Sequence, residues 1–537
     1  MPNPMNPMII QGDKTVLLEV GNENYAPARD VLARFAELEK SPEYIHTYRI
    51  TPLSLWNAAA SGLDADEILA GLDEFAKYPV PGNVAHDITD HISRYGCVKL
   101  VKDEVNYPGE LHLISDDKFI IVELMQQKRF TKYVIEQIDS TRLSMHPVMR
   151  GHIKQILVQL GFPAEDLAGY VKGDALKFSL RETTVGGEDF APRHYQQEAA
   201  EIFYAGGSES GGSGTIVLPC GAGKTIVGMT VMEKVQTSTL ILAPNTVAVR
   251  QWINEIVDKT TLSRDDIGEY SGKVKEIRPI TVCTYQVLTY RRRGKKKEET
   301  GEGYEHFALF TARDWGLIIY DEVHLLPSPV FRITAEIQAR RRLGLTATLV
   351  REDGMEGDVF SLIGPKKFDV PWKDLERQGW IATARCHEVR IHLDEGRRAE
   401  YAMAPQRSKY RVAAENPAKL PVIHRLFEKH RKDRLLVIGM YIEQLQHIAR
   451  MLNAPILTGK TKIRDREKLY EQFRNGEINQ LVVSKVANFS IDLPDANVAI
   501  EVSGTFGSRQ EEAQRLGRIL RPKKDGSIAY FYSLVTR

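Results

Sequence analysis

The sequence predicts an α/β protein in which two tandem parallel-sheet domains follow two small α+β modules. Its second half alternates short apolar runs with segments of helical periodicity, which is typical of parallel βαβ units. One predicted strand precedes a Gly-rich loop, and seven further apolar runs follow it: TLILAP, ITVCTY, GLIIYDE, RLGLTAT, RLLVIGM, QLVVSK and VAIEVS. These are too many strands for one such sheet. We expect domains at 1–108, 109–188, 189–368 and 369–537, with the boundary between the two sheets near Gly364 to Lys373.

Length and composition agree with this organisation. A chain of 537 residues predicts about three or four domains, and 42% hydrophobic with 27% charged residues is typical of a globular protein. The net charge of +1 neither requires nor excludes nucleic acid, so DNA contacts must come from local patches. No run is long and apolar enough to span a bilayer. The cysteines form no C-x-x-C pair and favour reduced thiols over a metal site: Cys97, Cys220, Cys283 and Cys386.

The first module begins with a predicted strand at 14–20, followed by helical periodicity from Ala26 to Lys40. Thr51-Pro52 has the residues that favour a helix start, and Gly62 is a suitable end.

Asp64 and Glu67 have the spacing of a capping box before another helix, and Pro81-Gly82 precedes a third that runs to Arg94. A strand is expected at 97–103. Helices followed by a strand pair suggest a winged-helix-like module; a docking module without DNA contact fits the same pattern.

The second module, residues 111–185, has two strand-like runs, LHLIS and FIIVEL, and two helix-like runs, FTKYVIEQI and VMRGHIKQILVQLG. This mixture predicts a small α+β domain.

Two loops have unusual compositions. Residues 205–214 (AGGSESGGSG) are typical of a flexible linker. Residues 291–303 (RRRGKKKEETGEG) carry six basic side chains that could bind phosphates, or form a solvated loop partly neutralised by Glu298 and Glu299. If a variant that lacks these basic residues lost salt-sensitive affinity for DNA, phosphate binding by the loop would be favoured.

Residues 215–225 (TIVLPCGAGKT) have the strand–loop–helix context of a phosphate-binding P-loop. Glycines at 221 and 223 allow the backbone to curl and direct its N–H groups at phosphate oxygens. Lys224 is expected to reach the β- and γ-phosphates, and the Thr225 hydroxyl to bind Mg²⁺. The residues expected to bind the nucleotide here are Pro219, Cys220, Gly221, Ala222, Gly223, Lys224 and Thr225.

One residue departs from the P-loop pattern, since Leu218 stands where the first Gly is usual. The alternative is a Gly-rich turn that only links strand to helix. The GKT ending and both flanking elements favour the phosphate loop.

The run GLIIY ends in Asp321-Glu322-Val323-His324. An acidic pair at the carboxyl end of a buried parallel strand faces the ligand edge of the sheet. Asp321 is expected to hold Mg²⁺, mostly through water, and Glu322 to orient and polarise the attacking water. The alternative is an acidic cap of a helix or turn.

The segment QRLGRILRP at 514–522 supplies a charge stabiliser. On a helix, Gln514, Arg518 and Arg521 share one face, so both arginines can reach a developing phosphoryl charge. A basic surface helix explains the charge but not the Gly517 between these residues.

In this order, the P-loop, DEVH, Thr346-Ala347-Thr348 and QRLGRILR resemble a superfamily-two helicase. LGLTATLVRED (343–353) and DLPDANV (492–498) are similar to the XPB helicases of nucleotide excision repair. The resemblance covers nearly the whole chain and includes a family RED element at Arg351, Glu352 and Asp353.

The resemblance implies two RecA-like domains and an ATP- and Mg²⁺-dependent 3′→5′ DNA helicase or translocase in nucleotide excision repair. Its substrate would be forked, single-stranded or duplex DNA, with repair proteins such as a nuclease as partners. A damage-recognition-like domain is expected at 109–188. The family's long acidic eukaryotic extension is absent, which favours a bacterial homologue in the cytoplasm, associated with the nucleoid; a eukaryotic chain would be nuclear.

Family roles transfer to matching residues. Arg193 and Gln196 resemble the Q-motif that reads adenine, and Asp492 resembles an acid near the nucleotide. His324, Thr346 and Thr348 resemble residues that couple ATP hydrolysis to DNA movement. The implied DNA contacts are Thr246, Arg250, Thr284, Tyr285, Arg351, Glu352, Asp353 and Ser484. Such contacts would be largely independent of base sequence.

Two features depart from the pattern. Ser490 replaces a Gly common at this motif in other helicases, a replacement that XPB proteins share. Residues 393–419 are short for the thumb insertion of archaeal relatives, and this departure bears on strand separation. Three alternatives stand beside the helicase: duplex translocation without unwinding, an RNA helicase, and an ATP-gated damage-binding switch built on residues 1–185.

Overall fold

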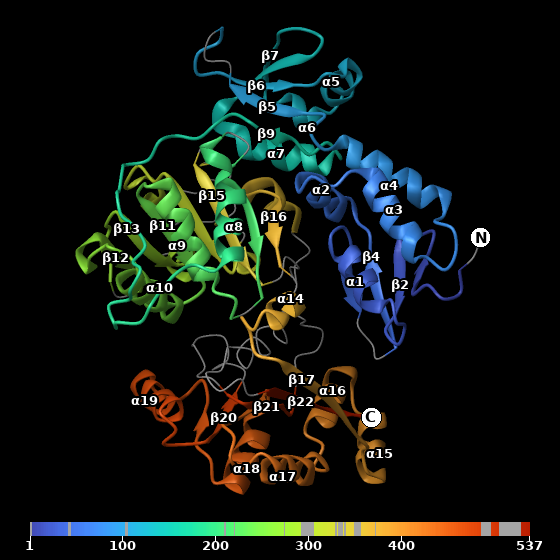
Figure 1. The fold of residues 1–537 in the computed structure, drawn as a ribbon, viewed down its shortest axis with the longest axis vertical. Coiled ribbons are helices and arrows are strands. Elements are labelled where there is room, and N and C mark those ends of the chain that lie inside the picture. The colour runs from blue at the N-terminus through green and yellow to red at the C-terminus, as the bar shows by residue number, and fades with distance from the viewer. Residues whose placement is uncertain are drawn as a thin grey trace. The chain divides into compact units, whose positions relative to one another are not determined.

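The computed structural model divides the chain into two compact units (Figure 1). The first comprises Met1–Val217, Thr225–Pro244 and Trp252–Asp369; the second comprises Leu218–Lys224, Asn245–Gln251 and Val370–Arg537. The described residues are 3–40, 44–102, 106–208, 211–219, 221–272, 274–290, 306–327, 330, 334, 337, 340–347, 356–370, 372–484, 496–503 and 528–537.

The N-terminal module is a four-stranded antiparallel sheet in the order β1-β2-β4-β3, with helices that share its core. Its strands are β1 (Met8–Ile10), β2 (Thr15–Glu19), β3 (Glu37–Lys40) and β4 (Ile45–Arg49). Its helices are α1 (Tyr25–Ala33), α2 (Pro52–Ala60), α3 (Ala65–Phe75) and α4 (Gly82–Arg94).

The predicted helix starts in this module are confirmed. The Thr51 hydroxyl accepts a hydrogen bond from the Ser54 N–H at 3.0 Å, and the Asp64–Glu67 capping box begins α3. The helix predicted to run to Lys40 is wrong beyond Ala33, because residues 37–40 pair with β4 as β3. Pairing with a neighbouring strand overrides the local preference of ELEK for helix.

The next module contains a five-stranded sheet in the order β7-β8-β6-β5-β9. Its strands are β5 (Lys99–Lys102), β6 (Leu111–Ile114), β7 (Val134–Gln137), β8 (Arg142–Met145) and β9 (Glu165–Asp166). Its helices are α5 (Lys118–Met125), α6 (Lys128–Thr131), η1 (Pro147–Met149) and α7 (Arg150–Gln159).

Three expectations for these modules are corrected. The strand within 97–103 exists as β5 but pairs with β6, outside the N-terminal sheet. FIIVEL is helical, because Asp117 caps the N–H of Phe119 at 2.8 Å and α5 buries one helical face through Ile121 and Leu124. FTKYVIEQI, expected as a helix, contains the end of α6 followed by strand β7.

Residues 173–185 continue from this module along the first parallel-sheet domain. The Asp174 N–H donates to the Asp314 carbonyl at 2.8 Å, and the Ser238 N–H donates to the Asp174 carbonyl at 2.7 Å. Gly173 lies so close to Gly316 that an added Cβ would be 2.1 Å from the Gly316 nitrogen. The close approach of two backbones therefore requires glycine here.

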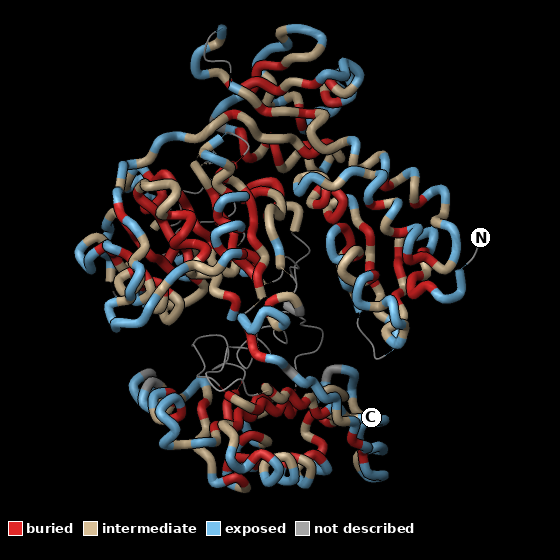
Figure 2. Tube along the Cα trace, in the orientation of Figure 1, coloured by how far each residue is buried: buried red, intermediate tan, exposed pale blue. Residues whose placement is uncertain are grey.

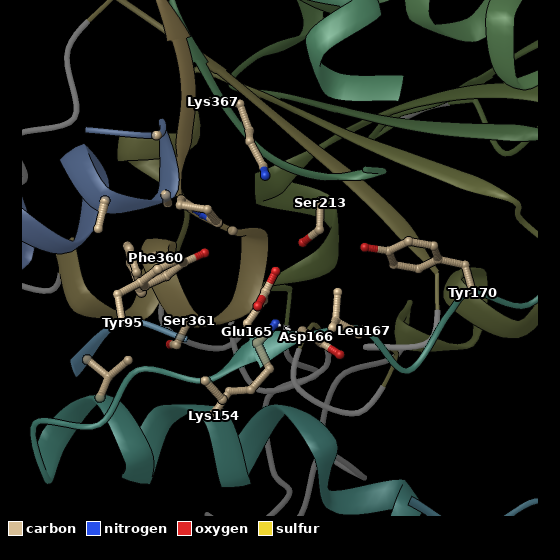
Figure 3. Close-up of a pocket in the computed structure, with 17 residues that line it drawn as sticks. Tyr95, Lys154, Glu165, Asp166, Leu167, Tyr170, Ser213, Phe360, Ser361 and Lys367 are labelled. Carbon is tan, nitrogen blue, oxygen red and sulfur yellow. Dashed lines mark hydrogen bonds and ion pairs between the residues drawn. The ribbon is translucent and has the colours of Figure 1, made fainter. Parts of the chain in front are cut away.

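A buried ion cluster joins the second module to the first parallel sheet. The Asp166 carboxylate binds Arg150 at 2.9 Å and Lys154 at 3.0 Å, and the Arg342 guanidinium lies over the Tyr170 ring. Although burial opposes it, Arg150 and Lys154 hold the pKa of Asp166 well below its usual value. A cavity of about 300 Å³ adjoins the cluster, and Figure 3 shows the Tyr170 hydroxyl and the Lys367 ammonium group directed into it.

The first parallel sheet has seven strands in the order β12-β13-β11-β14-β15-β10-β16. They are β10 (Ser213–Val217), β11 (Thr239–Ala243), β12 (Ile267–Tyr270), β13 (Ile280–Thr284), β14 (Leu317–Asp321), β15 (Arg341–Thr346) and β16 (Lys366–Asp369). The described helical elements are α8 (His194–Tyr204), η2 (Ala205–Gly207), α9 (Lys224–Val235), α10 (Thr246–Lys259), η3 (Arg264–Asp266), α11 (Tyr285–Leu288), η5 (Phe307–Thr311), η6 (Val323–Leu325), α13 (Glu356–Asp358) and η7 (Val359–Ile363).

The second parallel sheet has six strands in the order β17-β22-β21-β18-β20-β19. They are β17 (Ala384–Ile391), β18 (Leu435–Gly439), β19 (Ile456–Leu457), β20 (Gln480–Ser484), β21 (Val498–Glu501) and β22 (Ala529–Thr536). Its described helices are α14 (Trp372–Arg377), α15 (Glu395–Met403), α16 (Gln406–Ala414), α17 (Lys419–Lys429), α18 (Ile442–Leu452) and α19 (Ile463–Arg474).

All seven apolar runs and the run before the Gly-rich loop form strands, as predicted. Within β18, Leu436 and Ile438 enter one core cluster whereas Leu435 and Val437 enter another, so this sheet is covered on both faces. Figure 2 shows that the strands of both parallel sheets consist largely of buried residues. Among the described helices, none has the length and apolar character to cross a membrane.

Candidate active site

The order of the first sheet gathers the predicted motifs at one edge. Strand β10 pairs in parallel with β15, placing Val217 opposite Thr346. Strand β15 pairs in parallel with β14, placing Leu345 opposite Asp321. Parallel strands end at the same edge of a sheet. That edge therefore carries the loop after β10, Thr346 at the end of β15 and the acidic pair at the end of β14.

The loop after β10 has the geometry that a phosphate-binding turn needs. Gly221 has φ +82° and Gly223 has φ +79°, a left-handed conformation that side chains disfavour. The Ala222 N–H donates to the Pro219 carbonyl at 3.1 Å, and α9 begins at Lys224. Thr225 lies in the first turn of that helix, where free N–H groups favour an anion.

Leu218 is fully buried. Its core position accounts for an apolar side chain where the usual pattern has its first glycine.

The acidic pair ends β14. The Asp321 carboxylate accepts a hydrogen bond at Oδ2 from the Trp252 indole Nε1 at 3.0 Å, and its main-chain carbonyl accepts one from the Tyr285 hydroxyl at 2.9 Å. Glu322 has φ +47° and ψ +56°, which is uncommon for a residue other than glycine. Strained backbone of this kind is concentrated at functional sites, and here it turns the chain abruptly out of the strand.

His324 connects this acidic pair to β15. Its Nδ1 lies 2.7 Å from Thr346 Oγ1 and 3.5 Å from Glu322 Oε2. Both His324 and Thr346 are buried. The contact therefore joins the ends of two adjacent strands away from solvent.

The two Q-motif candidates interact with each other at the start of α8. The Arg193 N–H donates to Gln196 Oε1 at 2.8 Å, and Arg193 Nη1 donates to the Tyr195 hydroxyl at 3.2 Å. Gln196 is buried, and its amide oxygen takes part in the N-terminal cap of α8 in this structure.

The DNA-contact candidates of the first sheet differ in exposure. Asn245 Oδ1 accepts from the N–H groups of the next turn and caps α10, on which Thr246 is partly exposed and Arg250 is exposed. Thr284 and Tyr285 are buried: Thr284 caps α11 and Tyr285 supports Asp321. The last two side chains therefore offer no exposed surface for DNA in this structure.

Ser484 ends β20 in the second sheet and is buried, and its Oγ has no hydrogen-bond partner among the described residues. Several predicted site residues lie outside the described residues: Cys220, Thr348, Arg351, Glu352, Asp353, Asp492, Gln514, Arg518 and Arg521. The basic loop at 291–303 also lies outside them.

Trp252 and the supporting role of Tyr285 were missed by sequence reasoning. Trp252 closes the run APNTVAVRQW, in which only Thr246 and Arg250 were selected. A tryptophan at helical spacing on an apolar face reads as core, and only the fold shows that its indole N–H meets a carboxylate.

Two protein-family models match the chain in separate ranges that correspond to its two parallel-sheet domains. The model for "ERCC3/RAD25/XPB C-terminal helicase" matches residues 375–537, and "Type III restriction enzyme, res subunit" matches 189–351. "Helicase conserved C-terminal domain" matches residues 8–139, which here form the N-terminal modules. The solved helicase domain of Pyrococcus furiosus Hef matches 64% of this chain and 96% of its own, at 15% identity and a TM-score of 0.43.

Several relatives match nearly the whole chain at much higher sequence identity. "DNA 3'-5' helicase XPB" of Mycobacterium tuberculosis is 52% identical over 99% of this chain and 93% of its own length. The protein of the same name from Kineococcus radiotolerans is also 52% identical, over 99% and 92% of the two chains. The Saccharomyces cerevisiae "General transcription and DNA repair factor IIH helicase/translocase subunit XPB/SSL2" is 30% identical over 98% of this chain and 69% of its own. With two parallel α/β sheets, an arrangement consistent with two RecA-like domains, this chain belongs to the XPB family of superfamily-two DNA 3′-5′ helicases.

Proposed function

We propose that this chain is an ATP- and Mg²⁺-dependent motor that moves 3′→5′ along DNA and unwinds or remodels it in nucleotide excision repair. One observation supports this most strongly. The Gly-rich loop, the acidic pair and the His324–Thr346 contact all follow adjacent parallel strands of one sheet. A nucleotide held by the loop would therefore meet both the hydrolytic acids and a connection to the next strand.

The available side chains suit ATP with Mg²⁺. Lys224 and the loop N–H groups would bind the phosphates, while the Thr225 hydroxyl and the Asp321 carboxylate offer the oxygen donors that Mg²⁺ prefers. The bound ion would neutralise charge on the β- and γ-phosphate oxygens. Glu322, turned out of β14 by its left-handed backbone, would orient and polarise the attacking water.

The second domain completes the proposal. Arg518 and Arg521 would stabilise charge on the γ-phosphoryl group, with Gln514 on the same predicted helix face and Asp492 near the nucleotide. Cycles of domain closure and opening would move the motor along one strand.

DNA would be held mainly through its backbone. Thr246 and Arg250 on α10 are the accessible candidates among the described residues, and Ser484 is a candidate of the second sheet. We propose a winged-helix-like module at 1–108 and a damage-recognition-like module at 109–188, with β5 of the first range contributing a strand to the sheet of the second. We expect repair proteins, including a nuclease, as partners and the bacterial cytoplasm as the location.

Steady-state ATPase with and without forked DNA, at low and moderate salt, tests the motor. The wild-type chain should be strongly stimulated by DNA, and the stimulation should fade with salt. Lys224→Ala and Glu322→Gln should abolish turnover, whereas Glu198→Gln, at an exposed position of α8, should not. Intact hydrolysis in Lys224→Ala would refute the assigned site.

Unwinding and duplex translocation are separated by two substrates assayed in parallel. Displacement of a fork strand requires base-pair opening, whereas displacement of a triplex-forming strand requires only movement along duplex. Activity on the triplex alone would assign translocation without unwinding.

A further inference from the structure

Trp252 connects three elements of the predicted nucleotide site. It lies on α10, is 1% exposed, and its Nε1 donates to Asp321 Oδ2 at 3.0 Å. The two residues are distant in sequence, and Asp321 ends a different element, β14. A buried indole N–H needs an acceptor, and a carboxylate is a strong one.

The indole ring also packs against the helix that follows the Gly-rich loop. A Cβ added to Gly228 of α9 would lie 2.5 Å from Trp252 Cη2 and 3.4 Å from a Leu345 methyl. Gly228 thus leaves the space that the ring fills. The ring position is set by α9, which begins at Lys224, while its N–H is directed at Asp321.

A carboxylate that binds a metal works best when its orientation is fixed before the metal arrives. Tyr285 holds the main-chain carbonyl of Asp321, and Trp252 holds its side chain. Hydrogen bonds to one carboxylate oxygen restrict rotation about Cβ–Cγ. The indole contact therefore sets how Asp321 presents its carboxylate to the Gly-rich loop side of the sheet.

We propose that Trp252 is a positioning residue for the Mg²⁺ ligand Asp321, acting through the indole N–H, while Gly228 sets the position of its ring. This inference rests on the proposed function, because it assigns Asp321 to Mg²⁺. It makes no claim that Trp252 touches nucleotide.

Trp252→Phe in the full-length chain removes the N–H and retains an aromatic ring. The measurement is the affinity for a fluorescent ADP analogue, excited directly, with Mg²⁺ and with a chelator. In wild type, Mg²⁺ should raise the affinity for the analogue; this increase is the Mg²⁺ gain. In the variant the Mg²⁺ gain should be about tenfold smaller, as when a partner of a metal ligand is removed. Its affinity in chelator should be unchanged.

Trp315→Phe is the matched control. Trp315 is fully buried in the same domain and its Nε1 donates to the Leu309 carbonyl at 2.9 Å. The Trp315→Phe variant loses an indole hydrogen bond of the same kind, but one that does not involve Asp321, and should keep the full Mg²⁺ gain. An equal loss in both variants would assign the effect to general destabilisation and overturn the proposal.

A double-mutant cycle tests whether Trp252 acts through Asp321. In an Asp321→Ala background, Trp252→Phe should have no further effect on the Mg²⁺ gain. An undiminished effect in that background would overturn the proposal. If wild type shows neither ATP hydrolysis nor a Mg²⁺ gain, the proposed function itself fails, and the inference with it.

Gly228→Ala provides a second variant that leaves both hydrogen-bonding groups in place. The added methyl group should displace the ring, reducing the Mg²⁺ gain, and Trp252→Phe should then add little. A Gly228→Ala chain with the wild-type Mg²⁺ gain and an unchanged near-UV spectrum would contradict the assigned role of the ring position.

Discussion

His324 Nδ1 lies 2.7 Å from Thr346 Oγ1, and this buried contact joins the ends of the adjacent strands β14 and β15. His324 also lies 3.5 Å from the Glu322 carboxylate. A change in the position of Glu322, the acid proposed to orient the attacking water, can therefore reach the end of β15 through one imidazole ring. The segment that follows β15 carries the predicted coupling and DNA-contacting residues.

Thr346→Val should uncouple DNA movement from ATP hydrolysis. The substitution keeps the branched shape and removes the hydroxyl, leaving a buried imidazole nitrogen without its hydrogen bond. We expect fork unwinding to fall at least about tenfold while DNA-stimulated ATPase falls less, for a net loss of about 1.4 kcal/mol or more in the coupled step.

Thr334→Val is the control for this loss. Thr334 is buried in the same domain and its hydroxyl contacts the Tyr320 hydroxyl at 3.0 Å, away from His324. Equal losses of unwinding and ATPase in Thr346→Val would argue against a coupling role.

Asp166→Asn should strongly destabilise the junction between the second module and the first sheet. The carboxylate neutralises Arg150 and Lys154, which are 3% and 5% exposed, and asparagine would leave these buried cations without it. Removing one partner of a buried ion pair costs about 3 kcal/mol or more. The urea midpoint of the first unfolding transition of the full chain measures the effect.

Asp87→Asn is the matched surface substitution. Asp87 pairs with Lys14 at 2.8 Å, with its side chain 38% exposed. Such pairs contribute less than about 1 kcal/mol. Similar midpoints for the two variants would show that the Asp166 cluster contributes little to stability.

The sequence was informative where burial or a local motif determines structure. Strands such as β11 and β14 are buried on both faces, and their apolar runs have no helical periodicity. It failed for α5, because FIIVEL is apolar throughout and fits a strand or a helix equally well. There the decision lies with the Asp117 cap and with the neighbouring core.

The site shows the same division. Gly221, Gly223 and Lys224 are close together in the sequence, and Asp321 is next to Glu322, so short patterns alone suggest phosphate and water chemistry for the two groups. Trp252 and Asp321 meet only because the fold brings Trp252 of α10 to the end of β14, and no spacing within the sequence encodes that contact. His324 and Thr346 were selected separately by resemblance, but their hydrogen bond follows from strand pairing.

Lys419 should make the stability of the second unit depend on alkaline pH. Its ammonium group donates to the Val502 carbonyl at 2.7 Å, and burial lowers its pKa to about 8 from the usual 10.5. Between these values the native chain has lost the proton while the unfolded chain retains it, so stability should rise with pH from about 8 to 10.5, by roughly 3 kcal/mol at most.

Lys419→Met should remove this rise, whereas Lys460→Met on an exposed turn should retain it. Urea unfolding followed at several pH values gives the slope for each chain. Because cysteine thiols and tyrosine hydroxyls of an unfolded chain also titrate near this range, the difference from wild type is the quantity to compare. A slope in Lys419→Met equal to that of wild type would refute the assignment.

Gly173→Ala should detach the segment that crosses the first sheet domain. The new Cβ would lie 2.1 Å from the Gly316 nitrogen and 2.8 Å from the Asp314 carbonyl, and backbone atoms cannot move aside as a flexible side chain can. Relief of this clash would break the hydrogen bonds that Asp174 makes to Asp314 and Ser238. We expect a loss of more than about 2 kcal/mol and faster proteolysis within residues 173–185.

Gly272→Ala separates this clash from the general effect of replacing glycine. An added Cβ at Gly272 would meet no atom of the described residues within 4 Å, so the stability of this variant should be unchanged or slightly higher. Limited proteolysis and thermal unfolding of both variants give the comparison. Since the segment connects the second module to the strands that carry the proposed nucleotide site, its release should also lower DNA-stimulated ATPase in Gly173→Ala alone. Wild-type protease resistance in that variant would mean that the two backbones can separate without loss of the docked segment.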